Sequence, residues 1–325
     1  MAVTLGMVAE RAGVSRSAVS RAFTPGASVA PATRARVMQA AEALGYTPNL
    51  LARSLTTRQT GMVGLVLNNF HNPVFLQIFD LFTRGLQDRG LRPLLVNLSG
   101  ETDPARSVQL LRQYSADGVI VASSELPNAF AESFKAAGIP TVLAFGRGGA
   151  SPRVDVVSID NVEAGRMAAR ALIARGYDDV GFIGGPEGAT TTQDRWAGFA
   201  ELARARARFA GDYSYEAGHR AMQAELAAGR PAQAYFCADD VLSMGALAAL
   251  AEAGLSAPRD VGIIGLNDME LAGWAQARLT TIRQPFAEMV AAALERLTLL
   301  MADPGLTPVA RLLPCELVVR GTLRG

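Results

Sequence analysis

The stretch "TLGMVAERAGVSRSAVSRAF", residues 4–23, has the pattern of two short helices joined by a tight turn. Gly13 suits the turn, and Ser15 is a candidate N-cap for the second helix. Ala9 is a small residue where two helices would cross, and Val19 is an apolar residue that can face back across the turn. This spacing predicts a helix-turn-helix motif.

Polar side chains dominate the outer face of the second helix, at Arg16, Ser17, Ser20 and Arg21. Arginine can bridge O6 and N7 of guanine, and serine can donate to bases or phosphates. Residues 1–60 hold seven arginines and two acidic residues, a net charge of +5, whereas the remainder of the chain carries −4. A basic head on a mildly acidic body indicates a polyanionic partner. The alternative is an ordinary surface helix with scattered arginines.

A third helix is expected from Pro31 to Gly45, because proline suits the first turn and glycine the C-terminal end. We therefore assign residues 1–46 to a helical DNA-binding domain. Residues 47–60 are assigned to a hinge helix and linker, since the apolar part of this segment, 50–55, offers barely two turns. A helix this short is marginal alone, so we expect it to order when it is bound.

Residues 61–325 alternate short apolar runs with amphipathic helical stretches, which is typical of buried parallel sheets with helical crossovers. The number of strands over this length predicts two sheets and hence two α/β lobes. The predicted strands are 62–67, 92–98, 117–123, 140–145, 156–160, 180–185, 234–239 and 261–266.

Signatures of catalysis are missing from the sequence. It has no P-loop, no dinucleotide-binding glycine motif and no cysteine–histidine cluster with zinc spacing. Two histidines without a triad context offer no obvious base for acyl transfer. We therefore expect a non-enzyme without a cofactor or metal.

Cys237 and Cys315 lie far apart in apolar runs, which favours reduced thiols. The first residues lack the apolar core of a signal peptide, and no run approaches the ~20 apolar residues needed to span a bilayer. The sequence predicts a cytoplasmic protein without a membrane partner.

Beyond these patterns, the chain closely resembles the lactose-repressor (LacI) family of bacterial transcription regulators over essentially its whole length. The head and hinge carry the most specific part of the resemblance, at 4–23 and 29–55. Family motifs continue through the body in the family's order. They are "NPVF" (72–75), "ADGVIV" (116–121), "VVSIDN" (156–161), "DRWAGF" (194–199), "CADDVLSMGALAAL" (237–250), "DVGIIGLND" (260–268), "LTTIRQP" (279–285) and "LVVRGT" (317–322).

The resemblance implies contacts with double-stranded operator DNA. The residues implied to reach bases are Arg16, Ser17, Arg21 and the hinge leucine Leu55, which the family wedges into the minor groove. Residues implied to position the phosphate backbone are Leu5, Ser15, Ser20, Tyr46 and Asn49. A wedge that unstacks one base step costs a few kcal/mol, which additional contacts offset.

For the body, the resemblance implies the fold of periplasmic sugar-binding proteins, with two lobes, three crossovers and a small-molecule effector in the cleft. Ligands of such sheets lie beyond the carboxyl ends of the strands. The implied effector-binding residues are Asn72, Phe75, Phe145, Asp160, Thr191, Thr192, Arg195, Tyr213, Asp239, Asn267, Asp268 and Phe286. Amides and carboxylates beside aromatic rings suit a sugar, a sugar acid or a polyol.

Several of these positions have a second interpretation. Asp160 could equally cap the following helix, and Asn72 could open a turn. We expect Asp240 to cap the next helix rather than contact ligand. Asn267 stands where many family members carry a carboxylate. The segment 201–214 is shorter than the family's usual connection, which should contain a strand, so the second lobe is expected to be trimmed.

Together these observations predict a sequence-specific transcription regulator, acting as a homodimer on a near-palindromic operator under the control of a small molecule. Repression is the family's majority mode, and activation remains open. A cytosolic or exported sugar-binding protein without a regulatory role is the alternative from another class.

Overall fold

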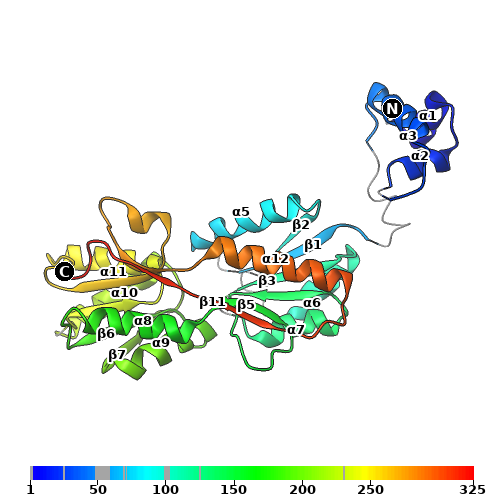
Figure 1. Cartoon of the computed structure of the whole chain (residues 1–325). Coiled ribbons are helices and arrows are strands. Elements are labelled where there is room, and N and C mark those ends of the chain that lie inside the picture. Colours follow the sequence, from blue (N-terminus) through cyan, green and yellow to red (C-terminus); the bar gives the residue numbers. More distant parts are fainter. Residues whose placement is uncertain are drawn as a thin grey trace. The chain divides into compact units, whose positions relative to one another are not determined.

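The computed structural model describes residues 3–24, 26–47, 59–68, 70, 72–98, 103–123, 126–229 and 231–325. The chain divides into two compact units, which we call the head, Met1–Thr60, and the body, Gly61–Gly325 (Figure 1).

Three helices build the head: α1 (Leu5–Ala12), α2 (Arg16–Ala22) and α3 (Pro31–Leu44). The side chains of Thr4 and Ser15 accept backbone N–H groups at the starts of α1 and α2. Each cap satisfies a donor that the first helical turn leaves without a partner.

Between α1 and α2, Gly13 adopts a left-handed conformation with φ of 61°. Ala9 and Val19 are buried where the helices cross, as the spacing predicts. The buried core of the head is Val8, Ala9, Ala12, Val19, Ala22, Val37, Ala40 and Ala41. The predicted helix-turn-helix is confirmed.

The body contains two six-stranded sheets, and each forms the centre of a lobe. Lobe 1 is entirely parallel, in the order β11-β5-β4-β3-β1-β2. Its strands are β1 (Met62–Leu67), β2 (Arg92–Asn97), β3 (Gly118–Ala122), β4 (Thr141–Ala144), β5 (Asp155–Ile159) and β11 (Ala310–Leu313). Its helices are α5 (Val74–Gln87), α6 (Pro104–Gln113), α7 (Asn128–Ala136) and α12 (Phe286–Ala302).

Lobe 2 has the order β12-β10-β9-β8-β6-β7, and β12 alone runs antiparallel to its neighbour. Its strands are β6 (Val180–Gly184), β7 (Ala205–Phe209), β8 (Ala234–Cys237), β9 (Gly262–Asn267), β10 (Thr280–Arg283) and β12 (Glu316–Val318). Its helices are α8 (Asn161–Ile173), α9 (Thr190–Leu202), α10 (Tyr215–Ala227), α11 (Asp240–Glu252) and the 3₁₀ helix η1 (Glu270–Gly273).

The chain passes between the lobes three times: between β5 and α8, between β10 and α12, and between β11 and β12 (Figure 1). One apolar cluster continues across this junction, because Leu266 and Ile282 of lobe 2 belong to the same buried cluster as Ile159 and Phe286. The predicted two-lobed body with three crossovers is confirmed.

The short segment 201–214 was expected to trim the second lobe, yet the strand of this connection is present. The segment 201–214 contains β7, which pairs with β6 in parallel from Ala205 to Phe209. This strand lies at the edge of the sheet, and two of its side chains are exposed. An edge strand tolerates charged residues, so its alternating alanines and arginines are compatible with pairing on one side only.

Helices α8 and α9 pack backbone against backbone through Gly165 and Gly198. A β-carbon on Gly198 would lie 1.8 Å from the carbonyl oxygen of Val162, and one on Gly165 would lie 2.1 Å from that of Arg195. Real β-carbons never approach this closely, so both positions require glycine. This contact sets where α9 places Arg195.

We expect Gly198→Ala to lower the free energy of unfolding by about 1–3 kcal/mol or more, because the added methyl group must push α9 away from α8. Gly211→Ala is the matched control, since a β-carbon there meets nothing within 4 Å. Urea unfolding followed by circular dichroism measures both variants. Equal stability of the two variants would contradict the close packing.

Candidate functional site

One face of α2 in the head is rich in hydrogen-bond donors. Arg16, Ser17, Ser20 and Arg21 are all exposed there. The Arg21 Nε–H donates to the Ser17 carbonyl oxygen over 3.4 Å. The guanidinium of Arg16 lies against Gly6 of α1. Arginine donors on this face suit base edges or phosphates.

The other head residues that the resemblance singles out have packing roles as well. Leu5 is half-buried against the head core. The Tyr46 ring lies 5.8 Å from that of Phe23, measured between centroids. Asn49 and Leu55 lie outside the described residues.

In the body, a pocket is lined by side chains of both lobes. Phe145 directly follows β4, Asp239 closely follows β8, and Asn267 ends β9. Asn72 lies between β1 and α5. The pocket therefore lies at the carboxyl ends of the strands, where parallel sheets bind ligands.

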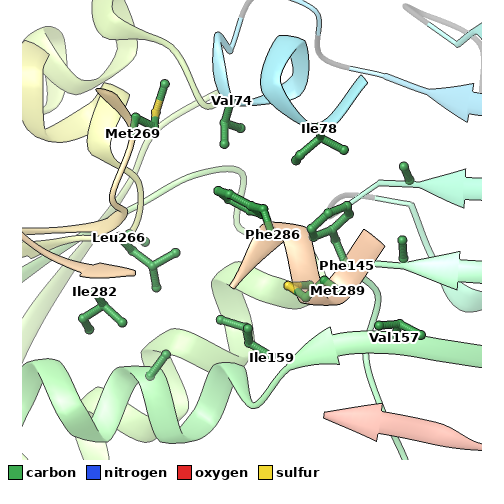
Figure 2. Packing of buried hydrophobic residues seen from close by; sticks show 14 of the residues in the cluster. Val74, Ile78, Phe145, Val157, Ile159, Leu266, Met269, Ile282, Phe286 and Met289 are labelled. Carbon is green, nitrogen blue, oxygen red and sulfur yellow. The ribbon is translucent and has the colours of Figure 1, made fainter. Parts of the chain in front are cut away.

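Apolar side chains form one wall of this pocket. Val74, Phe75 and Ile78 project from α5. Phe145 and Phe286 meet edge to face with ring centroids 6.0 Å apart. Figure 2 shows these two rings next to each other, with Val74 and Ile78 facing them.

The opposite wall is a hydrogen-bonded network around a carboxylate. The Nδ2 groups of Asn72 and Asn267 both donate to Asp239 Oδ2 over 2.9 Å. Gln284 Nε2 donates to Asn267 Oδ1 over 2.6 Å. The bond from Asn72 joins lobe 1 to lobe 2.

Asp239 is also the N-cap of α11, because its Oδ1 accepts the Val241 N–H over 2.8 Å. Burial raises the pKa of this carboxyl to about 6, while the donated hydrogen bonds act in the opposite direction. The expectation that Asp240 is the cap is therefore wrong by one residue. Asp240 instead accepts the Met269 N–H over 2.8 Å and the Thr281 hydroxyl over 2.5 Å.

Arg195 of α9 brings a buried guanidinium into the same pocket. Its Nε–H donates to Asn161 Oδ1 over 2.9 Å, and Nη1 donates to the Ala238 carbonyl over 2.7 Å. Both acceptors are neutral groups of lobe 2.

A second contact between the lobes involves Asp194, the residue before Arg195. Arg147, in the segment after β4, makes a two-pronged ion pair with Asp194 of α9 at 2.7 and 3.0 Å. Phe145 and Arg195, which line the pocket, are close to these partners in the sequence. The ion pair therefore ties both walls of the pocket together.

The backbone is strained where the strands meet the pocket. Phe145, Asn267 and Asp268 have φ angles of 67°, 129° and 55°. Such conformations cost of order 1–3 kcal/mol each in residues with side chains, and they cluster at functional sites.

Most of the residues expected to bind effector line this pocket: Asn72, Phe75, Phe145, Arg195, Tyr213, Asp239, Asn267 and Phe286. Thr191 and Thr192 do not line it. Their hydroxyls lie 3.3 and 2.6 Å from the Tyr213 hydroxyl, so they position that ring from behind.

Asp160 and Asp268 also lie outside the pocket lining. Asp160 caps α8 by accepting the Glu163 N–H over 2.9 Å, which was its alternative interpretation. Asp268 forms ion pairs with Arg283 at 2.7 Å and Arg320 at 2.5 Å, so its carboxylate is used within the protein.

Five further residues line the pocket and were not expected from the sequence: Val74, Ile78, Ser158, Asn161 and Gln284. Ser158 is the polar residue within the otherwise apolar end of β5, and Gln284 follows β10. Both are polar residues near the carboxyl end of a strand, where parallel sheets bind their ligands. This position in the sequence could have identified them.

No group of three or more histidine, cysteine, aspartate or glutamate side chains suited to a metal ion occurs among the described residues. Within the same residues, no helix has the length and apolar character that crossing a membrane requires.

A helix-turn-helix head joined to a two-lobed body with a pocket between the lobes defines a class, that of DNA-binding transcription regulators with a ligand-binding domain. The comparisons with known proteins agree. Residues 4–49 match the model of the lacI family of bacterial regulatory proteins, and residues 169–323 match that of the periplasmic binding protein-like domain.

The HTH-type transcriptional repressor PurR of Edwardsiella ictaluri is 31% identical over 90% of this chain and 89% of its own length. A lac repressor dimer bound to operator and the anti-inducer ONPF superposes with a TM-score of 0.88 at 25% identity, covering 99% of both chains. The CelR–cellobiose complex superposes with a TM-score of 0.71 at 30% identity, covering 98% and 99%. This chain belongs to the lacI family of bacterial transcription regulators.

The buried carboxyl of Asp240, next to the pocket residue Asp239, gives a prediction for pH dependence. Burial raises the pKa of Asp240 to about 7, so the folded protein binds a proton that the unfolded chain releases at about pH 4. Stability from this group therefore falls as the pH rises between these values. We expect Asp240→Asn to be about 1 kcal/mol or more stable than the parent at about pH 8, and to lose less stability between about pH 5 and 8.

Asparagine at 240 can still accept the Met269 N–H and can donate to the Thr281 hydroxyl. Asp239→Asn is the contrasting variant, because its new N–H₂ group would face the donors of Asn72 and Asn267. We expect that variant to be destabilised. Urea unfolding across the pH range measures both, and an unchanged pH slope in Asp240→Asn would refute the assignment.

Proposed function

We propose that this regulator is a repressor that binds a near-palindromic operator as a homodimer, and that a small polyhydroxylated effector in the interlobe pocket controls its operator affinity. One observation carries the proposal. The same chain joins a donor-rich face of α2 to a pocket whose polar network spans both lobes.

In the DNA-bound form, α2 lies in the major groove and presents Arg16, Ser17 and Arg21 to base edges. Ser20 and Ser15 lie at its flank and its N-terminus, where they reach phosphates. Two heads related by two-fold symmetry read two half-sites, which explains a near-palindromic operator. The similar lac repressor dimer bound to operator supports this arrangement.

The effector acts through the relative positions of the lobes. A ligand that contacts Asn72 of lobe 1 and Arg195 of lobe 2 binds the two lobe arrangements unequally. Such a ligand shifts the population between them by its difference in affinity. The similar CelR–cellobiose complex supports a sugar-like ligand.

The pocket is proposed to bind its ligand without reaction. Asp239 is the carboxylate among the lining residues, and three N–H donors occupy its oxygens. A carboxylate held in this way is poorly placed to take a proton from a ligand.

DNA selected from a random library by the full-length protein provides the operator for a direct test. We expect Arg21→Ala to weaken binding to the selected site by about 5- to 150-fold, because a two-pronged contact with guanine contributes about 1–3 kcal/mol. Binding to unrelated DNA should weaken much less. Fluorescence anisotropy at fixed salt concentration measures both.

Arg11→Ala is the matched control, since it removes an exposed arginine from α1 rather than α2. It should lower specific and non-specific binding to a similar, small extent. If Arg21→Ala did the same, α2 would not be the reading helix. If no ligand altered operator affinity, the regulatory half of the proposal would fail.

A further inference from the structure

The guanidinium of Arg195 is a buried charge without an ionic partner. The residue is 5% exposed, and its two hydrogen bonds go to a side-chain amide oxygen and a backbone carbonyl. Among the described residues, no carboxylate lies within ion-pair distance of it. Proteins almost always pair a buried charge, because desolvation without a counter-charge is expensive.

The Asp239 carboxylate interacts electrostatically with Arg195 but forms no ion pair with it. Arg195 and Asp239 are the charged residues in the lining. The oxygens of Asp239 accept hydrogen bonds from Asn72, Asn267 and the Val241 backbone, and neither accepts one from Arg195. The cation therefore faces the pocket with three of its five N–H donors uncommitted.

Further donors lie beside it. The Ser158 residue is 1% exposed, and its hydroxyl has no hydrogen-bond partner in the described structure, yet it lines the pocket. Asn161 accepts from Arg195 through Oδ1, which leaves its N–H₂ group to donate. A cation, a hydroxyl and an amide N–H₂ make this end of the pocket rich in donors and poor in acceptors.

We infer that the effector is a sugar acid or a closely related hydroxycarboxylate, whose carboxylate is bound by Arg195 with help from Ser158 and Asn161. This inference rests on the proposed effector pocket and specifies the chemical class of its ligand. Guanidinium and carboxylate form two parallel hydrogen bonds, which supplies the missing counter-charge. The carbon chain lies along Phe145 and Phe286, and Gln284 can reach a hydroxyl.

Pairs of compounds that differ in one group test the charge directly. Gluconate and sorbitol share a carbon chain and differ at one carboxylate, as do glucuronate and glucose. Thermal shift and titration calorimetry with the full-length protein measure each pair, together with galactonate and galactitol. We expect at least one acid to bind ten-fold or more tightly than its neutral partner. Equal or tighter binding of the neutral compounds, or no binding by any acid, would overturn the inference.

Variants assign the effect to the proposed residues. Arg195→Met should reduce affinity for the bound acid at least 100-fold, and Ser158→Ala should reduce it about ten-fold. Arg195→Lys retains the charge and should still bind the acid more tightly than its neutral partner. That result would show that substitution at 195 does not itself unfold the pocket. Arg84→Met, an exposed arginine of α5, is the control and should bind as the parent does. An unchanged affinity in both Arg195→Met and Ser158→Ala would place the carboxylate elsewhere.

The same ligands separate this inference from the proposed function. If an acid binds through Arg195 but leaves operator affinity unchanged, the carboxylate site stands and the regulatory role fails. If a neutral sugar changes operator affinity and no acid binds, the regulatory role stands and the carboxylate site fails.

Discussion

The carboxylate of Asp239 joins the two lobes of the body. One of its oxygens caps α11, and the other accepts from Asn72 of lobe 1 and Asn267 of lobe 2. Without this buried acceptor, two buried amide groups and the first turn of α11 would lose their partners. Its placement at the end of β8 therefore orders a strand end, a helix start and the contact between the lobes at once.

A ligand pocket follows from this arrangement because the same groups line it. Arg195 comes from α9, whose position depends on the close glycine contacts with α8. Phe145 and Phe286 come from the end of β4 and the start of α12. Elements of both lobes thus meet around one small space, and any change in how the lobes sit alters it. A ligand can therefore control the arrangement of the lobes, because both lobes form its binding pocket.

The sequence predicted some of the pocket residues correctly and others incorrectly. Asn72, Phe145 and Asn267 were expected there because they lie at strand ends, and the structure puts them in the lining. Thr191 and Thr192 were expected there because, like Arg195, they follow the strand 180–185, but they support Tyr213 from behind. Both threonines lie on the same side of α9 as Arg195, but their short side chains contact the Tyr213 hydroxyl, and the tyrosine lines the pocket in their place.

By itself, the sequence determined the helix-turn-helix head and the alternation of buried strands with helices, because caps, turns and hydrophobic periodicity act over a few residues. Only the tertiary structure decided that 201–214 adds an edge strand and that Asp239, rather than Asp240, is the cap. The unpaired charge of Arg195 and the free hydroxyl of Ser158 also became visible only there. The reason is distance along the chain: Asn72 and Asp239 are 167 residues apart and meet only when both sheets are folded.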